Sequence, residues 1–238
     1  MKRTLFFVFA LSYACGFAQE SKELTKLKQQ SNAVVTMSNS TANPNFMRFE
    51  NAEGLQLKAM DAKGKVSEFL ATNFKAFNLN SEKDMVFVDV TTDNYGLKNV
   101  IYRQTFNGIP VYDGILKFHF NGKGQLSSLN GNTISAIKVN TIASISPSEA
   151  SAIAVNLVKN QNITTSKNQL EAAKNNLLIF PKNLVQGGQI TPYLAYEIEV
   201  TNKSDVREFL FIDAHTGELV EQFTGIHPID RKLYETST

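Results

Sequence analysis

The chain has 238 residues, with 24 Lys or Arg against 22 Asp or Glu, so its formal net charge is +2. This near-neutral balance argues against nucleic acid or an anionic membrane surface as the partner. The one cysteine, Cys15, lies near the N-terminus. Without residues 1–18 the chain has no disulfide, thiol nucleophile or thiolate metal ligand. The roughly 220 residues left exceed one typical domain, so two small domains are expected.

Residues 1–18 have the pattern of a secretory signal peptide. A positive start and a short apolar run precede small residues, which predicts cleavage between Ala18 and Gln19. The run is much shorter than the ~20 apolar residues of a membrane-spanning helix. Cys15 raises the alternative of a lipoprotein, but the residues before it make a poor lipobox. We therefore expect export, to the secreted or periplasmic fraction.

Residues 19–45 are rich in Ser, Asn, Gln and Lys, and we expect a poorly packed polar leader there. From residue 61 to 79, apolar residues recur at spacings of three and four, which predicts a helix with one buried face. After this helix the apolar period changes to two, which predicts strands in three segments: 86–90, 100–105 and 116–120. The turn signal Asn121-Gly122 predicts a hairpin over residues 114–134.

A second unit with the same order of elements is expected over residues 146–224. Ser146 and Glu149 form a capping box around Pro147, which predicts the start of a helix. Its buried stripe is Ala150, Ile153, Ala154, Leu157 and Val158. Strands are expected in four segments: 177–180, 193–200, 206–212 and 219–223. Residues 135–145 are the expected linker, and 225–238 the tail.

A helix with one apolar stripe, followed by alternating strands, predicts an α+β fold for each unit. Each unit is then a small domain in which a helix packs on a curled antiparallel sheet.

The sequence shows no self-contained catalytic or metal site. A zinc peptidase needs two His one helical turn apart with a Glu between them. His119, His215 and His227 have no such neighbours, and His119 is expected to be exposed to solvent on a strand. A nucleophile elbow, a complete dinucleotide loop and a calcium loop are also missing from the sequence. We therefore expect no catalytic residue, no metal and no cofactor.

The most distinctive stretch lies between residues 102 and 131. Its residues are Tyr102, Arg103, Gln104, Gly108, Ile109, Pro110, Val111, Tyr112 and Gly114, followed by Asn130 and Gly131. This succession resembles the fungalysin/thermolysin propeptide (FTP) domain, with the resemblance covering roughly residues 46–134. The glycines and the proline are turn residues in any reading, so the motif indicates a fold first and a function second.

The second unit resembles the PepSY domain. The residues that carry this likeness are Tyr196, Glu197, Phe211, Ile212, Asp213, Thr216, Gly217 and Glu218. The two resemblances together imply two cystatin-like domains that form the pro-region of a secreted thermolysin-like zinc metallopeptidase. They also imply the partner, which is the catalytic domain of such a peptidase, in cis or in trans. The implied roles are inhibition of that domain and assistance in its folding.

The catalytic module that the resemblance leads one to expect does not follow in this sequence. Three explanations stay open: a fragment of a longer precursor, a truncated gene, and a separate inhibitor or chaperone. The charged run from Asp230 to Glu235 favours the first two. PepSY domains also occur without a peptidase, so a free-standing secreted binding module is the alternative function. An independent enzyme has only unpaired carboxylates in its favour.

Overall fold

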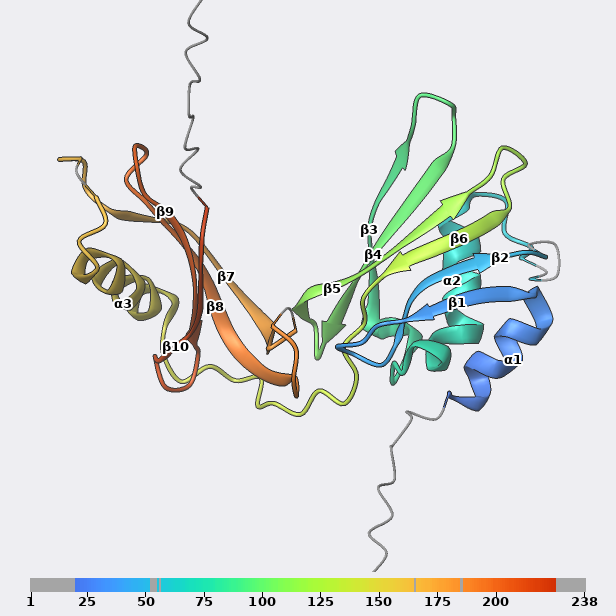
Figure 1. The fold of residues 1–238 in the computed structure, drawn as a ribbon, viewed down its shortest axis with the longest axis horizontal. Coiled ribbons are helices and arrows are strands. Elements are labelled where there is room, and N and C mark those ends of the chain that lie inside the picture. Colours follow the sequence, from blue (N-terminus) through green and yellow to red (C-terminus); the bar gives the residue numbers. More distant parts are fainter. Residues whose placement is uncertain (1–19, 52–54, 56, 165, 185, 226–238) are drawn as a thin grey trace, which may run out of the picture.

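The computed structural model describes residues 20–51, 55, 57–164, 166–184 and 186–225, which form an α+β fold (Figure 1). The first unit contains α1 (Lys22–Ser31), β1 (Ala33–Met37), β2 (Pro44–Phe49), α2 (Ala62–Asn73), the 3₁₀ turns η2 (Phe74–Phe77) and η3 (Glu82–Asp84), β3 (Met85–Thr92), β4 (Lys98–Phe106), β5 (Ile109–Phe120) and β6 (Leu126–Gly131). The second contains α3 (Pro147–Asn160), β7 (Glu171–Lys182), β8 (Thr191–Thr201), β9 (Arg207–Asp213) and β10 (Leu219–Thr224).

Helix α2 covers one face of the first sheet, as its apolar spacing predicts. Its side chain Phe69 is fully buried and makes edge contacts with three rings, at centroid distances of 5.8 Å to Phe49, 6.2 Å to Phe77 and 5.9 Å to Phe118. Burial of a side chain of this size contributes about 1.5–3 kcal/mol to folding. The predicted hairpin forms from β5 and β6.

The expectation of a poorly packed leader is wrong. Residues 22–31 form α1, which begins where the backbone N–H of Leu24 donates to Ser21 Oγ (3.1 Å). Leu24 and Leu27 are each 1% exposed in the core of the first unit, and β1 pairs with β2. The polar composition conceals this packing, because a short helix needs only two or three apolar residues on one face.

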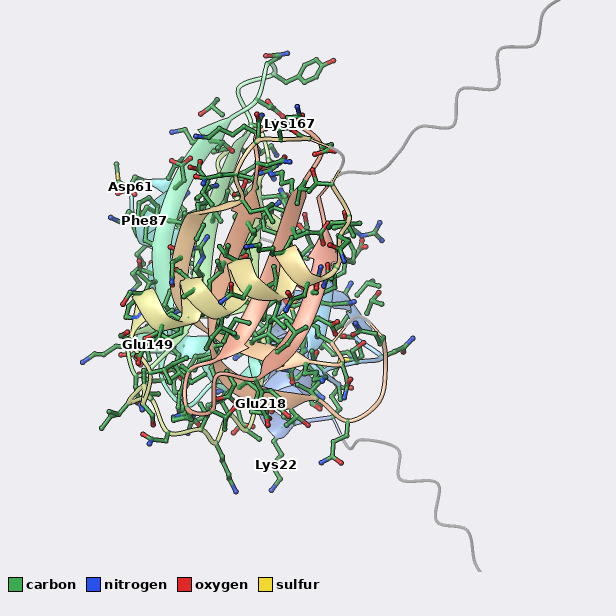
Figure 2. All side chains as sticks on the ribbon, turned by 90° about the vertical axis from the view of Figure 1, so that its left-hand side faces the viewer. Lys22, Asp61, Phe87, Glu149, Lys167 and Glu218 are labelled. Carbon is green, nitrogen blue, oxygen red and sulfur yellow. The ribbon has the colours of Figure 1, made fainter. Side chains whose placement is uncertain are left out.

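In the second unit, α3 begins with the predicted capping box. The N–H of Glu149 donates to Ser146 Oγ (3.2 Å), and the N–H of Ser146 donates to Glu149 Oε2 (2.8 Å). Ala150, Ala154 and Val158 are buried against the sheet. Figure 2 looks onto α3 as it lies across the strands of this sheet, with the labelled Glu149 near its start. Small alanines let the helix approach the strands closely.

The sheets of the two units are joined through β5 into one hydrogen-bonded array. Its strand order is β1-β2-β6-β5-β7-β8-β9-β10, with β3 added on β4. All pairs within the units are antiparallel, but β5 and β7 pair in parallel, with Val111 opposite Ile179. The sequence predicts the antiparallel hairpins and not this join, because a parallel pair between distant segments leaves no turn signal.

The predicted linker is packed along the second unit. Residues 132–145 form a segment that we call the strap. Ile134 and Ile137 are buried in the core of the second unit. The N–H groups of Ser144 and Ile145 both donate to the carbonyl of Ala214 (2.8 and 3.1 Å). The strap therefore belongs to the folded body and fixes how the units are joined.

Substitution of Gly131 tests the backbone geometry at the point where β6 meets the strap. Its φ is +138°, and an added Cβ would lie 1.9 Å from the carbonyl oxygen of Ile115. We expect Gly131→Ala to lower the free energy of unfolding by about 2 kcal/mol or more, measured by urea denaturation. Gly122→Ala is the control, since its Cβ would meet no atom within 4 Å. Equal stability of the two variants would contradict this geometry.

Candidate functional site

Each sheet has one face without a helix among the described residues. In the first unit α1 and α2 pack on one side, where Tyr102 and Gln104 of β4 are buried, while Arg103 between them points to the other side and is exposed. In the second unit α3 lies on the side of its sheet that points away from the first unit (Figure 1). We call the two helix-free sides the open faces.

A kink in β5 brings the open faces to one junction. Arg103 pairs with Ile115, but Thr105 pairs with Pro110, so extra residues of β5 bulge out between these pairs. Asp113 in the bulge has a φ of +56°. This conformation costs an L-residue free energy, so it persists only where surrounding contacts hold it. Asn132 Nδ2 donates to Asp113 Oδ2 (2.8 Å) and helps to hold it.

Gly114 completes the kink. A Cβ on it would lie 2.9 Å from Gln104 Cβ, so only glycine lets β5 pass so close to β4. The preceding hairpin is also built for a tight reversal. Asn107 and Gly108 both have positive φ, which is the signature of a two-residue type I′ turn. The predicted FTP motif is therefore a hairpin followed by a kink.

An open hollow of about 340 Å³, which we call the junction hollow, lies beside the kink. Its lining residues are Arg103, Pro110, Val111, Tyr112, Asp113, Ile115, Leu178 and Glu197. Among the described residues, the side chains of Arg103 and Glu197 form no hydrogen bond or ion pair. An unpaired cation and an unpaired anion in one concave site suit recognition of a charged and apolar protein surface.

Aromatic rings fill the open face beside this hollow. Phe180 stacks on Phe211 with a centroid distance of 4.1 Å, and Tyr112 lies 5.3 and 5.1 Å from these two rings. A second hollow, of about 210 Å³, lies against Tyr112, Phe180 and Phe223. Burial raises the pKa of the Tyr112 hydroxyl, with smaller contributions from the charges of Glu197 and Asp113. Tyr112 and its neighbour Asp113 thus line both hollows.

Further along the second open face, Glu199 is held between two cations. Arg207 Nε lies 2.8 Å from Glu199 Oε1, and Lys174 Nζ lies 3.5 Å from Oε2. The hydrogen bond from Arg207 is the main reason why the pKa of Glu199 is lowered. Because its charge is already compensated, Glu199 offers less to a partner than Glu197.

The expectation of a solvent-exposed His119 is wrong. The ring is half-buried on the open face, with Nδ1 2.6 Å from Asn99 Oδ1 and Nε2 2.6 Å from Asn130 Oδ1. These contacts tie β4, β5 and β6 together across the face. The motif residue Asn130 thus has a structural role, and Gly131 beside it makes the close approach described above.

The end of the PepSY motif lies elsewhere. Asp213 Oδ1 accepts the N–H groups of His215 (2.7 Å) and Thr216 (3.0 Å), and Gly217 has a φ of +76°. These contacts build the β9–β10 turn, where Glu218 is exposed (labelled in Figure 2). Gly217 lies against Ile153 of α3, on the helix-covered side. This turn is a structural element.

The remaining motif residues divide between core and junction. Tyr102 is in the first core, where its hydroxyl lies 2.8 Å from Ser67 Oγ. Tyr196 faces α3 and donates to the carbonyl of Ile145 (3.0 Å). The others packed in the second unit are Ile109, Val111 and Ile212 in the α3-side core and Phe211 in the aromatic cluster. The cleavage residues Ala18 and Gln19 lie outside the described residues.

The structure therefore brings Arg103, Pro110, Val111 and Tyr112 of the first motif against Glu197 and Phe211 of the second. Sequence reasoning missed several members of this site, among them Asp113, Phe180 and Phe223. Asp113 stands inside the motif, and its position between Tyr and Gly was the available signal. Phe180 and Phe223 have no signal of their own, because their role depends on the parallel join.

Two kinds of feature are not found in the described part of the chain. It contains no group of three or more His, Cys, Asp and Glu side chains placed to hold a metal ion. It also contains no helix of the length and apolar character needed to cross a membrane.

Two family models match parts of the chain. Residues 83–133 match the fungalysin/thermolysin propeptide motif, and residues 144–223 match the peptidase propeptide and YPEB domain. A transglutaminase-activating metalloprotease of Streptomyces mobaraensis is 30% identical over 160 residues, which are 66% of this chain and 20% of that protein. Bacillolysin of Bacillus subtilis is 25% identical over 182 residues, 75% of this chain and 34% of that protein.

The chain thus spans at most about a third of the length of these curated relatives. Among solved structures, the C-terminal domain of Bacillus megaterium YpeB aligns with 86% of this chain and 97% of that one, at 13% identity and a TM-score of 0.37.

Titration can measure how Glu197 affects the pKa of Tyr112. We expect Glu197→Gln to lower the pKa of Tyr112, because it removes a negative charge that disfavours the phenolate. The pKa should stay above its ordinary value, since burial is the larger cause. NMR of tyrosine Cζ as a function of pH measures it, with the exposed carboxylate variant Glu218→Gln as the control. A response to Glu218→Gln equal to that of Glu197→Gln would contradict the proximity.

Proposed function

This chain carries a propeptide region of the thermolysin-like type, an FTP motif followed by a PepSY domain, and from this premise we propose that it binds the catalytic domain of a thermolysin-like metallopeptidase. It inhibits that domain until release and assists its folding. Turnover belongs to the partner and not to this chain. Export through the signal peptide of residues 1–18 places the chain outside the cytoplasm.

The open faces are the proposed contact surface. They offer apolar side chains that are exposed on a sheet, among them Val34, Phe46 and Val86. They also offer charges without partners among the described residues, Arg103 and Lys117 on the first unit and Glu197 on the second. Apolar contacts supply affinity, and unpaired charges supply orientation and specificity.

Tethering explains how such a surface inhibits and later releases its target. A pro-region on the same chain faces its enzyme at an effective concentration of order millimolar, so modest contacts give nearly complete occupancy. Once the peptide link is cut, this advantage is lost. In trans, the same contacts require micromolar or higher concentrations of the separate chain.

The observation that carries the proposal is the meeting of the two motifs at the junction hollow. Arg103 and Tyr112 come from the first motif and Glu197 from the second, and all three line one concave site. Two binding modules that acted independently would not need their motif residues in one place. The functional units proposed here are residues 46–134 and 146–224, acting together.

Addition of the purified chain to a thermolysin-like peptidase tests inhibition directly. We expect slower hydrolysis of a peptide substrate in a dose-dependent manner, and a higher yield of active enzyme when the denatured peptidase is refolded with the chain. The controls are the heat-unfolded chain and a serine peptidase. The proposal fails if hydrolysis is unaffected at concentrations of order tens of micromolar.

Charge reversal at the junction tests the contact surface. We expect Arg103→Glu to raise the inhibition constant about tenfold or more, since it turns an attractive charge in the hollow into a repulsive one. Lys26→Glu makes the same change on exposed α1, on the helix side of the sheet, and should leave the constant within about twofold. Far-UV circular dichroism checks that both variants are folded. Equal inhibition by both variants would exclude the hollow from the contact surface.

A further inference from the structure

Gln104 is a buried side chain whose amide group forms both backbone hydrogen bonds of one strap residue, as a paired strand would. It is 3% exposed, and its Nε2 donates to the carbonyl of Ile134 (2.7 Å) while its Oε1 accepts the N–H of Ile134 (2.8 Å). Both polar groups of one strap residue are thus satisfied by one side chain of β4. Loss of such a side chain leaves a buried donor and a buried acceptor unpaired.

The bonded residue belongs to both units. Ile134 places its side chain in the core of the second unit. Its neighbour Thr133 is anchored in the first, because its Oγ1 donates to the carbonyl of Phe77 (3.0 Å) and its own carbonyl accepts Asn43 Nδ2 (2.7 Å). Gln104 therefore bonds the strap at the point where it leaves one core and enters the other.

The opposite side of the join is narrow. β5 and β7 are joined by a parallel pairing whose register is Val111 opposite Ile179. The backbone pairing is therefore short, and side-chain packing completes the join, since Val111 lies in the core under α3 and Tyr112 packs on Phe180 and Phe211. Gln104 also lies against the kink itself, since Gly114 approaches its Cβ. Gln104 thus contacts both the strap and the strand that pairs with β7.

We infer that Gln104 is a positioning residue that locks the angle between the two units, so that the open faces are held ready for the partner. The consequence for inhibition rests on the function proposed above. A surface already held in its binding geometry spends less free energy on ordering when it binds. Without the lock each unit keeps its own core, and the pair becomes hinged.

Electron–electron distance measurements on the isolated chain test the lock. Spin labels at Lys26→Cys on α1 and Lys159→Cys on α3, in a chain carrying Cys15→Ser, report the separation of the units. We expect Gln104→Ala to broaden the distance distribution about twofold, because unpaired buried groups favour the opened states. Asn202→Ala is the matched control. Asn202 is also 3% exposed, and its Oδ1 accepts N–H groups only from residues 204–206 of its own unit.

A conservative variant separates the lock from a general loss of stability. In Gln104→Glu the introduced carboxyl group can donate to the carbonyl of Ile134 only when it is protonated. We expect a narrow, parent-like distribution at about pH 5 and a broad one at about pH 8.5, since burial raises the pKa of such a group. The parent chain should show no comparable change between these values.

Three outcomes would overturn the inference: a distribution in Gln104→Ala as narrow as in Asn202→Ala, a distribution in Gln104→Glu that ignores pH, or failure of both Gln104 variants to fold, which would make Gln104 a folding residue. The distance measurements need no peptidase, so they test the lock even if the parent chain proves not to inhibit one. If it does inhibit, Gln104→Ala should raise the inhibition constant about tenfold. An unchanged constant in a hinged variant would remove the lock from inhibition.

Discussion

Strand β5 takes part in two sheets at once, and this shared strand is the constraint on which the rest of the structure depends. Its C-terminal part lies between β4 and β6, and its N-terminal part reaches β7 through Val111. A straight strand cannot serve both, because the two sheets are strongly inclined to each other (Figure 1). The bulge at Asp113 and Gly114 resolves this conflict by bending β5 between its two stretches of pairing with β4.

The bend decides where function can lie. Side chains alternate along a strand, so just before the kink Val111 enters the core under α3 while Tyr112 enters the aromatic cluster on the open face. The helices occupy the other sides of both sheets. What remains for a partner is the pair of open faces, whose charged side chains at the junction, Arg103 and Glu197, are not neutralised by each other.

Local signals in the sequence predicted the local structure. The periodicity of three and four gave α2, the capping box at Ser146 gave the start of α3, and Asn121-Gly122 gave the β5–β6 hairpin. The motif likeness pointed to two propeptide families, and the models of these families match residues 83–133 and 144–223. These features depend on residues within a few positions of each other, which is where sequence patterns are informative.

Apart from helix α1, which its polar composition conceals, the parts that could not be predicted depend on contacts between distant segments. Val111 and Ile179, or Gln104 and Ile134, meet only after the chain has folded, and neither pair has a composition that marks it.

The residues that carry the family likeness divide into those that the fold requires and those that are free for recognition. Gly108, Gly114 and Gly131 are required by backbone geometry, and Val111 and Tyr112 by two different cores. Each would be needed in any protein with this join, whatever it binds. Specificity for a partner must therefore reside in side chains that the fold does not need, which is why exposed Arg103, within the motif but outside both cores, is the residue whose chemistry is free to serve recognition.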